Sequence, residues 1–203
     1  MPGPLPIALT IAGSDPSGGA GVQADLKTFQ QFAVYGEAVI TLITVQNTTR
    51  VSKVEVLDPV LISQQISAVL EDIPPAAIKT GALGNAAVIE AIAAQTFPCP
   101  LVVDPVLISK HGAPLADRAA EDALVRLFPK TALVTPNLPE AARLAGIEVS
   151  TVADMREAAL RIAGLGAAAV LVKGGHLEGE ALDLLYSGGE FTEFPAPRIP
   201  TQH

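Results

Sequence analysis

The sequence predicts a single doubly wound α/β domain over residues 1–203. Short apolar runs alternate with amphipathic segments almost throughout the chain. The runs are rich in Val, Ile, Leu and Ala and mostly lack polar alternation, which is typical of strands buried on both faces of a parallel sheet. Apolar residues make up 49% of the chain and charged residues 17%, which indicates a globular protein with a well-buried core.

The expected elements follow from local patterns. The apolar runs predict strands at 7–13, 38–47, 76–81, 101–106, 132–137 and 169–175, and a hairpin over 180–199 that turns at residues 188 and 189. A first helix is expected where apolar residues recur at spacings of three and four, at Val22, Leu26, Phe29 and Ala33. A second begins at Asp58 and Pro59. A third begins with a capping box of Thr151 and Asp154 and ends at Gly164.

Composition excludes several classes of function. The formal net charge of −8 argues against nucleic acid or an anionic membrane as a partner. Cys99 is the only cysteine, so neither an internal disulfide nor a cysteine metal cluster is possible. The first residues lack the basic region of a signal peptide, and no apolar run is long enough to span a bilayer. We therefore expect a cytoplasmic protein.

Polar residues stand where the predicted strands end. Ligands of open α/β sheets bind at the carboxyl ends of the strands, so these residues are expected at one functional edge. They are Ser14, Asp15, Gln46, Asn47, Lys79, Asp104, Asn137 and Lys173.

A glycine-rich loop, GSDPSGGAG, follows the first predicted strand. Gly13 and Gly18 have the spacing of a Walker A loop, but Gly19 and Ala20 stand where its lysine and hydroxyl belong. A dinucleotide fingerprint also fits poorly, because several residues separate the strand from Gly19. A purely structural turn stays open as an interpretation, although two carboxylates flank the loop.

Each strand-end residue has a structural and a functional interpretation. Asn137 and Glu140 have the spacing of a helix capping box, and Asp104 is in a position typical of a cap or turn. Together with Lys173, however, these oxygen-bearing side chains suit Mg²⁺ and a polyphosphate. Gln46 suits either a neighbouring backbone group or the edge of a heteroaromatic ring.

Six segments together resemble the hydroxymethylpyrimidine/phosphomethylpyrimidine kinases of thiamine biosynthesis, which belong to the ribokinase-like superfamily. They are AGSDPSGGAGVQADLKT, ITLITVQNT, IKTGALG, VVDPVLISKHG, TPNLPEAARLAG and LVKGGH, in the family's order. The resemblance runs from about Ile7 to His203 and implies a three-layer α/β/α sandwich with a mostly parallel central sheet. It implies phosphorylation of 4-amino-5-hydroxymethyl-2-methylpyrimidine and of its monophosphate, with ATP and Mg²⁺ as cofactors, by a homodimer.

The resemblance also implies roles for individual residues. The substrate pocket would be lined by Gly13, Ala20, Asp25, Gln46 and Val106. Nucleotide binding would involve Asn137 and Lys173, and the metal would be held by Asp104 and Glu140.

Two departures from the family pattern qualify these expectations. Ala82 stands where family members often carry methionine, which should enlarge the pocket. The family's glycine-rich turn, which carries the catalytic base, is expected after His203, so no catalytic residue is assigned within residues 1–203. Two alternatives stay open. One is a pyridoxal or pyridoxine kinase, which shares the superfamily and a hydroxymethyl heterocycle as substrate, and the other is a non-catalytic pyrimidine-binding protein, which the missing turn suggests.

Overall fold

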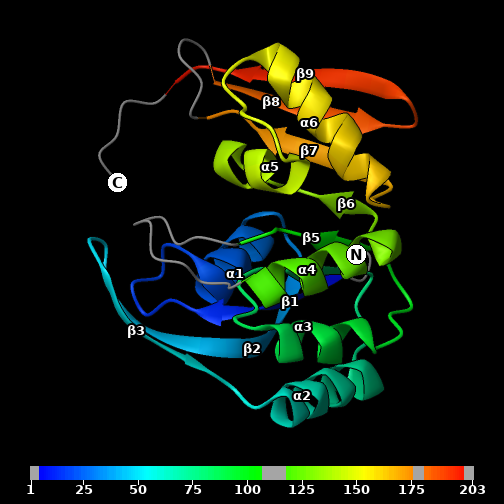
Figure 1. The fold of residues 1–203 in the computed structure, drawn as a ribbon. Helices are drawn as coiled ribbons and strands as arrows, with labels where there is room; N and C mark the ends of the chain where they lie inside the picture. Colours follow the sequence, from blue (N-terminus) through cyan, green and yellow to red (C-terminus); the bar gives the residue numbers. More distant parts are fainter. Residues whose placement is uncertain (1–4, 107–117, 176–180, 199–203) are drawn as a thin grey trace. The chain divides into compact units, whose positions relative to one another are not determined.

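The computed structural model describes residues 5–106, 118–175 and 181–198. The chain divides into two compact units, each with strands and helices of its own (Figure 1). The first unit comprises residues 1–102 and 106–127, and the second comprises residues 103–105 and 128–203.

The first unit is built on a sheet with the strand order β3-β2-β1-β4-β5. Its strands are β1 (Ile7–Ser14), β2 (Tyr35–Gln46), β3 (Val51–Val56), β4 (Ala77–Thr80) and β5 (Leu101–Val103), whose last residue falls in the second unit. β1 pairs in parallel with both β2 and β4, whereas β3 pairs antiparallel with β2. Leu9, Ile11 and Val39 are fully buried, as expected for central strands.

The helices of the first unit are α1 (Gly21–Gln31), α2 (Pro59–Asp72), α3 (Ala86–Ala93) and α4 (Arg118–Leu127). The start predicted for α2 is confirmed, because the Asp58 carboxylate accepts a hydrogen bond from the Val60 amide at 2.7 Å. The predicted apolar face of α1 was partly wrong. Val22 is its only buried residue, and Ala33 lies beyond the helix with a φ of 54°.

The second unit contains the strand order β6-β7-β8-β9. Its elements are the 3-10 helix η1 (Phe128–Lys130), β6 (Leu133–Val134), α5 (Leu138–Ala145), α6 (Val152–Gly164), β7 (Ala169–Lys173), β8 (Ala181–Ser187) and β9 (Glu190–Ala196). β6 pairs in parallel with β7, and β7, β8 and β9 pair antiparallel. The predicted hairpin is confirmed, with Gly188 and Gly189 at φ values of 60° and 87° in its turn.

The predicted start of α6 is also confirmed. The Thr151 hydroxyl accepts a hydrogen bond from the Asp154 amide, and the Asp154 side chain accepts one from the Thr151 amide. The helix buries an apolar face made of Met155, Ala158, Ala159 and Ile162.

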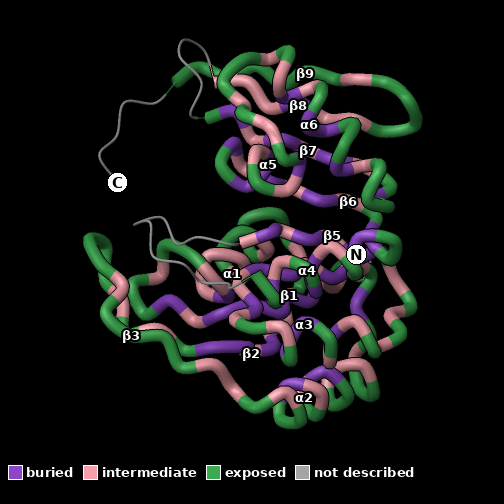
Figure 2. The backbone as a smooth tube through the Cα atoms, in the orientation of Figure 1, coloured by how far each residue is buried: buried purple, intermediate pink, exposed green. Residues whose placement is uncertain are grey.

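The α/β fold class is therefore confirmed. Figure 2 shows that buried backbone gathers on strands such as β1, β2 and β7, while turns are exposed. Strands β5 and β6 are much shorter than predicted: β5 ends at Val103 and β6 spans only Leu133–Val134, so Asp104 and Asn137 lie in the loops that follow. A search of the described residues finds no helix with the length and apolar character that a membrane span requires.

Candidate functional site

In the first unit, the glycine-rich loop is folded around the carboxylate of Asp15. Asp15 is only 3% exposed. Its Oδ1 accepts hydrogen bonds from the Ser17 amide at 2.8 Å and the Ser17 hydroxyl at 2.7 Å. Its Oδ2 accepts from the amides of Gly19 at 3.2 Å and Ala20 at 2.9 Å. Asp15 therefore fixes the loop conformation, and the loop is an ordered structure.

A second set of contacts joins the loop to β1. The Gln23 side chain accepts a hydrogen bond from the Asp15 amide at 2.9 Å and donates one to the Ser14 hydroxyl at 2.8 Å. Gly21 has a φ of 59°, and a side chain there would collide with the Gly13 carbonyl oxygen. These contacts hold Ala20, the N-cap residue of α1, beside the end of β1.

Asp25, in α1, lies in a cluster with Thr10 of β1 and Lys79 of β4. Its Oδ2 accepts hydrogen bonds from the Thr10 hydroxyl at 2.6 Å and from the Lys79 ammonium at 2.8 Å. Thr10 is fully buried, and the lysine and aspartate side chains are 24% and 19% exposed. We refer to these three residues as the first cluster.

Gln46 ends β2 at an irregularity in the ladder with β3, where the register shifts between Val45 and Gln46. Such bulges change the direction of a side chain. Thr44 ties this end of β2 to the loop by donating to the Ser14 carbonyl at 2.9 Å. Gln46 is partly buried, and its side-chain amide makes no hydrogen bond to any residue that the structure describes. Its amide therefore has both donors and acceptors for a ligand.

Gly13, Ala82 and Val106 are the remaining residues of the first unit that were expected near the substrate. A Cβ at Gly13 would lie 2.5 Å from the Leu42 Cδ1, so packing alone requires glycine there. The carbonyl of Ala82 accepts a hydrogen bond from Thr41 at 2.7 Å. Val106 is partly exposed and follows β5. Its role against a substrate ring stays a prediction.

The second unit contains a similar cluster after β5, β6 and β7. The Asp104 Oδ1 accepts hydrogen bonds from the Lys173 ammonium at 2.9 Å and from the Thr135 hydroxyl at 3.3 Å. The lysine side chain is 38% exposed and the aspartate side chain 24%. We refer to Asp104, Thr135 and Lys173 as the second cluster. It forms because the parallel strands β6 and β7 end at the same edge.

Asn137 and Glu140 lie directly beside the second cluster. Asn137 forms an isolated parallel bridge with Lys173. Its side chain accepts from the Glu140 amide at 2.9 Å, and Glu140 Oε2 accepts from the Asn137 amide at 2.9 Å. The capping box is therefore present, and Glu140 is only 4% exposed. Capping does not exclude a ligand role for Glu140, because a carboxylate oxygen can accept more than one interaction.

The carboxylates of the second unit fit an Mg²⁺ ion held largely by a nucleotide. Within the ranges that the structure describes, no three side chains of His, Cys, Asp or Glu come together in a way that could hold a metal ion. Mg²⁺ usually binds through one or two carboxylates together with phosphate oxygens and water. Asp104 engages only its Oδ1 with the described residues. Asp104, with Glu140 beside Asn137, offers the oxygen ligands that such an ion requires.

Sequence reasoning indicated no role for Thr10, Gln23 or Asp183, and it placed Lys79 at the functional edge without a partner. The Asp183 carboxylate accepts a hydrogen bond from the Gly174 amide at 3.0 Å and so fixes the turn after Lys173. The signal for Lys79 was its position within the apolar strand segment AIKT, because a lysine enclosed there needs a polar or charged partner.

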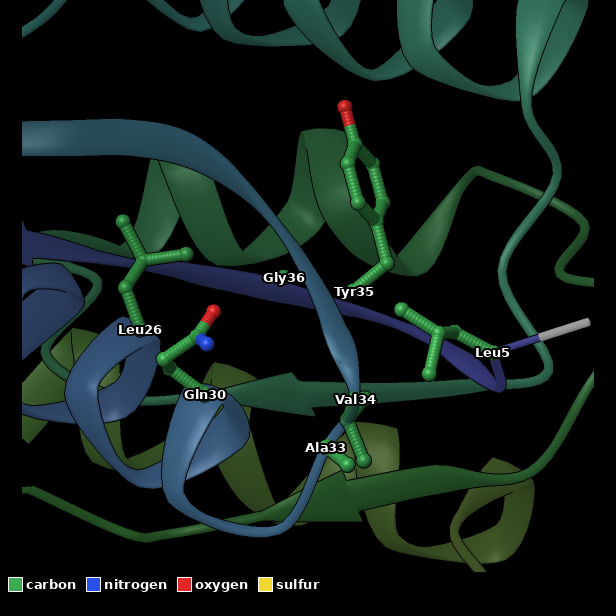
Figure 3. A pocket seen from close by; sticks show the side chains of 7 residues that line it. All are labelled: Leu5, Leu26, Gln30, Ala33, Val34, Tyr35 and Gly36. Carbon is green, nitrogen blue, oxygen red and sulfur yellow. The ribbon is translucent and has the colours of Figure 1, made fainter. Parts of the chain in front are cut away.

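A pocket of about 360 Å³ lies in the first unit near the start of β2, away from Gln46 at the other end of that strand (Figure 3). It is lined by Leu5, Leu26, Gln30, Ala33, Val34, Tyr35 and Gly36. None of these lining residues is a carboxylate or a lysine, so the polar clusters are the better candidates for phosphate chemistry.

Comparison with known proteins gives consistent results. A model of the phosphomethylpyrimidine kinase family matches residues 15–203. The chain is 44% identical over 202 residues to the hydroxymethylpyrimidine/phosphomethylpyrimidine kinase of Bacillus subtilis, covering 97% of this chain and 74% of that protein. It is 49% identical over 203 residues to a thiamine biosynthesis bifunctional protein of Geobacter sulfurreducens, covering 98% of this chain but only 41% of that protein.

Solved structures show the same likeness. The phosphomethylpyrimidine kinase of Clostridium difficile has a TM-score of 0.85 and 47% identity, with 93% of this chain and 84% of that chain covered. The pyridoxal kinase of Staphylococcus aureus in complex with AMP-PCP and pyridoxal has a TM-score of 0.87 and 37% identity, with 99% and 75% covered. These neighbours confirm the ribokinase-like fold class, and the matched residues show that the chain belongs to the phosphomethylpyrimidine kinase family.

Proposed function

We propose that this protein uses ATP and Mg²⁺ to phosphorylate 4-amino-5-hydroxymethyl-2-methylpyrimidine and then its monophosphate. The observation that carries the proposal is the second cluster, in which Asp104 and Lys173 meet at 2.9 Å beside the Asn137–Glu140 capping box. A lysine, an amide and carboxylates at one strand edge are the groups that bind a nucleotide polyphosphate with its metal.

Phosphoryl transfer depends mainly on positioning and charge neutralisation, so these residues need no covalent chemistry. Lys173 supplies a positive charge for phosphate oxygens, and Asn137 lies next to it as a polar contact for the nucleotide. Asp104 and Glu140 would hold the Mg²⁺ ion, which when bound neutralises charge on the phosphates. The Lys173–Asp104 pair holds both side chains in place before the nucleotide arrives.

The first unit supplies the groups for the pyrimidine alcohol. Gln46 presents both donors and acceptors, which suits an aminopyrimidine edge. Asp25 presents an acceptor, and Gly13 near the end of β1 and Ala20 in the ordered loop precede α1, the helix that carries Asp25. Val106 would pack on the ring. Residue Ala82 leaves more space than the methionine that the family often has at this position.

Pyridoxal kinase is the second candidate, because a pyridoxal-bound relative matches 99% of this chain with a TM-score of 0.87. Both substrates carry a hydroxymethyl group on a heteroaromatic ring. A coupled ADP-release assay on the complete protein, with the pyrimidine alcohol and pyridoxal side by side, separates the two. We expect clear preference for the pyrimidine. Preference for pyridoxal would overturn the assignment, and pyrimidine binding without turnover would support a non-catalytic binding protein.

We also propose that the protein is a cytoplasmic homodimer. The support within the structure is the apolar pair Ile43 and Val45 on β2, which are 49% and 57% exposed on one face of the strand. Exposed apolar neighbours on a strand often mark a protein interface. Light scattering on the wild-type protein and on Val45→Glu tests this, with a shift from dimer to monomer expected for the variant.

A further inference from the structure

Lys79 is held inside the first unit rather than extended into solvent. Its ammonium lies 2.8 Å from Asp25 Oδ2, and its side chain is 24% exposed. It pairs directly with Thr10 in the parallel ladder of β1 and β4. The Thr10 hydroxyl, which is fully buried, donates to the same Asp25 oxygen at 2.6 Å. Strands β1 and β4 therefore anchor a side chain of helix α1.

The backbone at Gly81 leaves room for this lysine. A Cβ at Gly81 would lie 3.0 Å from Lys79 Nζ and 2.9 Å from the Cβ of Ala12. A larger residue would therefore displace the ammonium from its position. Lysines on protein surfaces usually keep their charged end in water, so this enclosed arrangement indicates a specific purpose for the ion pair.

Both hydrogen bonds reach the same oxygen of Asp25. Its Oδ1 receives no hydrogen bond from any part of the chain that the structure describes. A carboxylate anchored at one oxygen has its plane and its second oxygen fixed, and that second oxygen can accept a hydrogen bond from a ligand. The first cluster thus has the form of an oriented acceptor.

We infer that Lys79 is a positioning residue for the substrate: it holds Asp25 through Oδ2 so that Oδ1 accepts a hydrogen bond from the amino or hydroxymethyl group of the pyrimidine. This inference rests on the proposed function, in which Asp25 contacts the pyrimidine alcohol. Lys79 itself acts through Asp25. Such preorganisation raises affinity because the acceptor is already oriented when the ligand binds.

A double-mutant cycle with Lys79→Met and Asp25→Asn tests the inference. Calorimetry on the complete protein measures affinity for the pyrimidine alcohol, and steady-state assays measure KM and kcat. In the wild-type background, Lys79→Met should weaken pyrimidine affinity roughly ten- to hundredfold, the range expected for a hydrogen bond to a charged group. In the Asp25→Asn background it should change affinity by less than about threefold, because coupled residues are not additive.

Two further variants serve as controls. Lys53→Met removes the exposed lysine that meets Glu55 at 3.0 Å, and it should leave pyrimidine affinity unchanged. Lys79→Arg keeps the charge and should retain more affinity than Lys79→Met. If Lys79→Met does not fold, Lys79→Gln takes its place in the cycle.

The outcomes separate this inference from the proposed function. Unchanged pyrimidine affinity in Lys79→Met, or an equal loss of affinity in both backgrounds, would overturn the role of Lys79. The proposed function would still stand in that case, provided that the wild-type protein binds the pyrimidine alcohol. A wild-type protein that does not bind the pyrimidine alcohol would overturn the proposed function, and this inference with it, before any variant is compared.

Discussion

The two compact units contain the same kind of cluster, but the one in the first unit is tighter. There, Asp25 accepts hydrogen bonds at one oxygen from Thr10 at 2.6 Å and from Lys79 at 2.8 Å. The lysine side chain is 24% exposed, and the residues come from two strands and a helix. Three elements thus restrain the carboxylate, which suits a fixed acceptor.

The cluster in the second unit is looser. Asp104 accepts from Lys173 at 2.9 Å but from Thr135 only at 3.3 Å, and the lysine side chain is 38% exposed. A more exposed pair is weaker, because solvent screens its charges. The same arrangement, in which a lysine and a threonine both donate to one aspartate oxygen, thus occurs in a tightly held form and in a more exposed form. Under the proposed function, the first cluster would keep its geometry during binding, whereas Lys173 would exchange Asp104 for phosphate oxygens when a nucleotide binds.

The largest effect should come from Lys173→Met. Loss of a preorganised positive charge at a phosphoryl group typically lowers kcat by about 10²–10³. The affinity for ATP should fall as well, while affinity for the pyrimidine alcohol should stay the same. Steady-state kinetics and calorimetry measure both. The control is Arg161→Met, which removes an exposed ion pair with Glu157 and a 3.3 Å hydrogen bond to the Ala145 carbonyl in the same unit. A kcat within about threefold of wild type would show that Lys173 is only structural.

The next effect concerns Gln46, whose amide has no partner among the described residues. Gln46→Leu keeps similar bulk but leaves polar ring atoms of the pyrimidine unpaired. We expect affinity for the pyrimidine to fall by about 1–3 kcal/mol, or roughly ten- to hundredfold, with KM for ATP unchanged. The matched control is Gln64→Leu, on an exposed position of α2. Calorimetry that finds equal pyrimidine affinity for Gln46→Leu and wild type would assign Gln46 a structural role.

A smaller effect compares the two threonines directly. Thr10→Val removes a 2.6 Å hydrogen bond from a fully buried position, so the free energy of unfolding should fall by about 1–2 kcal/mol. Thr135→Val removes only a 3.3 Å contact and should cost about 0.5 kcal/mol or less. Urea unfolding of both variants measures the difference. Equal losses would contradict the view that the first cluster is the tighter one.

Local patterns predicted much of the fold because caps, turns and apolar runs act within a few residues. The capping boxes of α5 and α6 and the Gly188–Gly189 turn all follow from such signals. Strand β3 was missed, because its residues are mostly exposed and it exists as a strand only through pairing with β2. The short β6 was predicted too long for a related reason, since tertiary pairing decides where a ladder ends.

The candidate site could be predicted only in part. A strand-end position is a local property, so Asp104, Asn137 and Lys173 could be placed at one edge from the sequence. Which side chains meet is a non-local property. Lys79 and Asp25 are 54 positions apart, and no local pattern pairs them. The capping role of Glu140 gives the same sequence spacing as a ligand role, so the sequence alone could not separate the two.

Glu37 is a carboxylate of the first unit that differs from Asp25, because one of its oxygens, Oε2, is buried without a hydrogen-bond donor among the described residues. Burial and, to a lesser extent, the charge of Asp72 raise the pKa of Glu37 above its ordinary value of 4.5. The folded protein therefore binds this proton more tightly than the unfolded chain does, so ionised Glu37 lowers stability at pH values above its raised pKa.

Glu37→Gln should therefore increase the free energy of unfolding by about 0.5 kcal/mol at pH 7, a modest gain because solvent partly screens the site. The gain should shrink as the pH falls through the raised pKa and should vanish below 4.5, where Glu37 is protonated in both states. Urea unfolding at several pH values measures it, with Glu71→Gln on the exposed surface of α2 as the control. A gain that persists below pH 4.5 would show that the effect comes from packing and not from the buried charge. Asp72→Asn should give a smaller gain with the same pH dependence, because the charge of Asp72 is the lesser of the two causes.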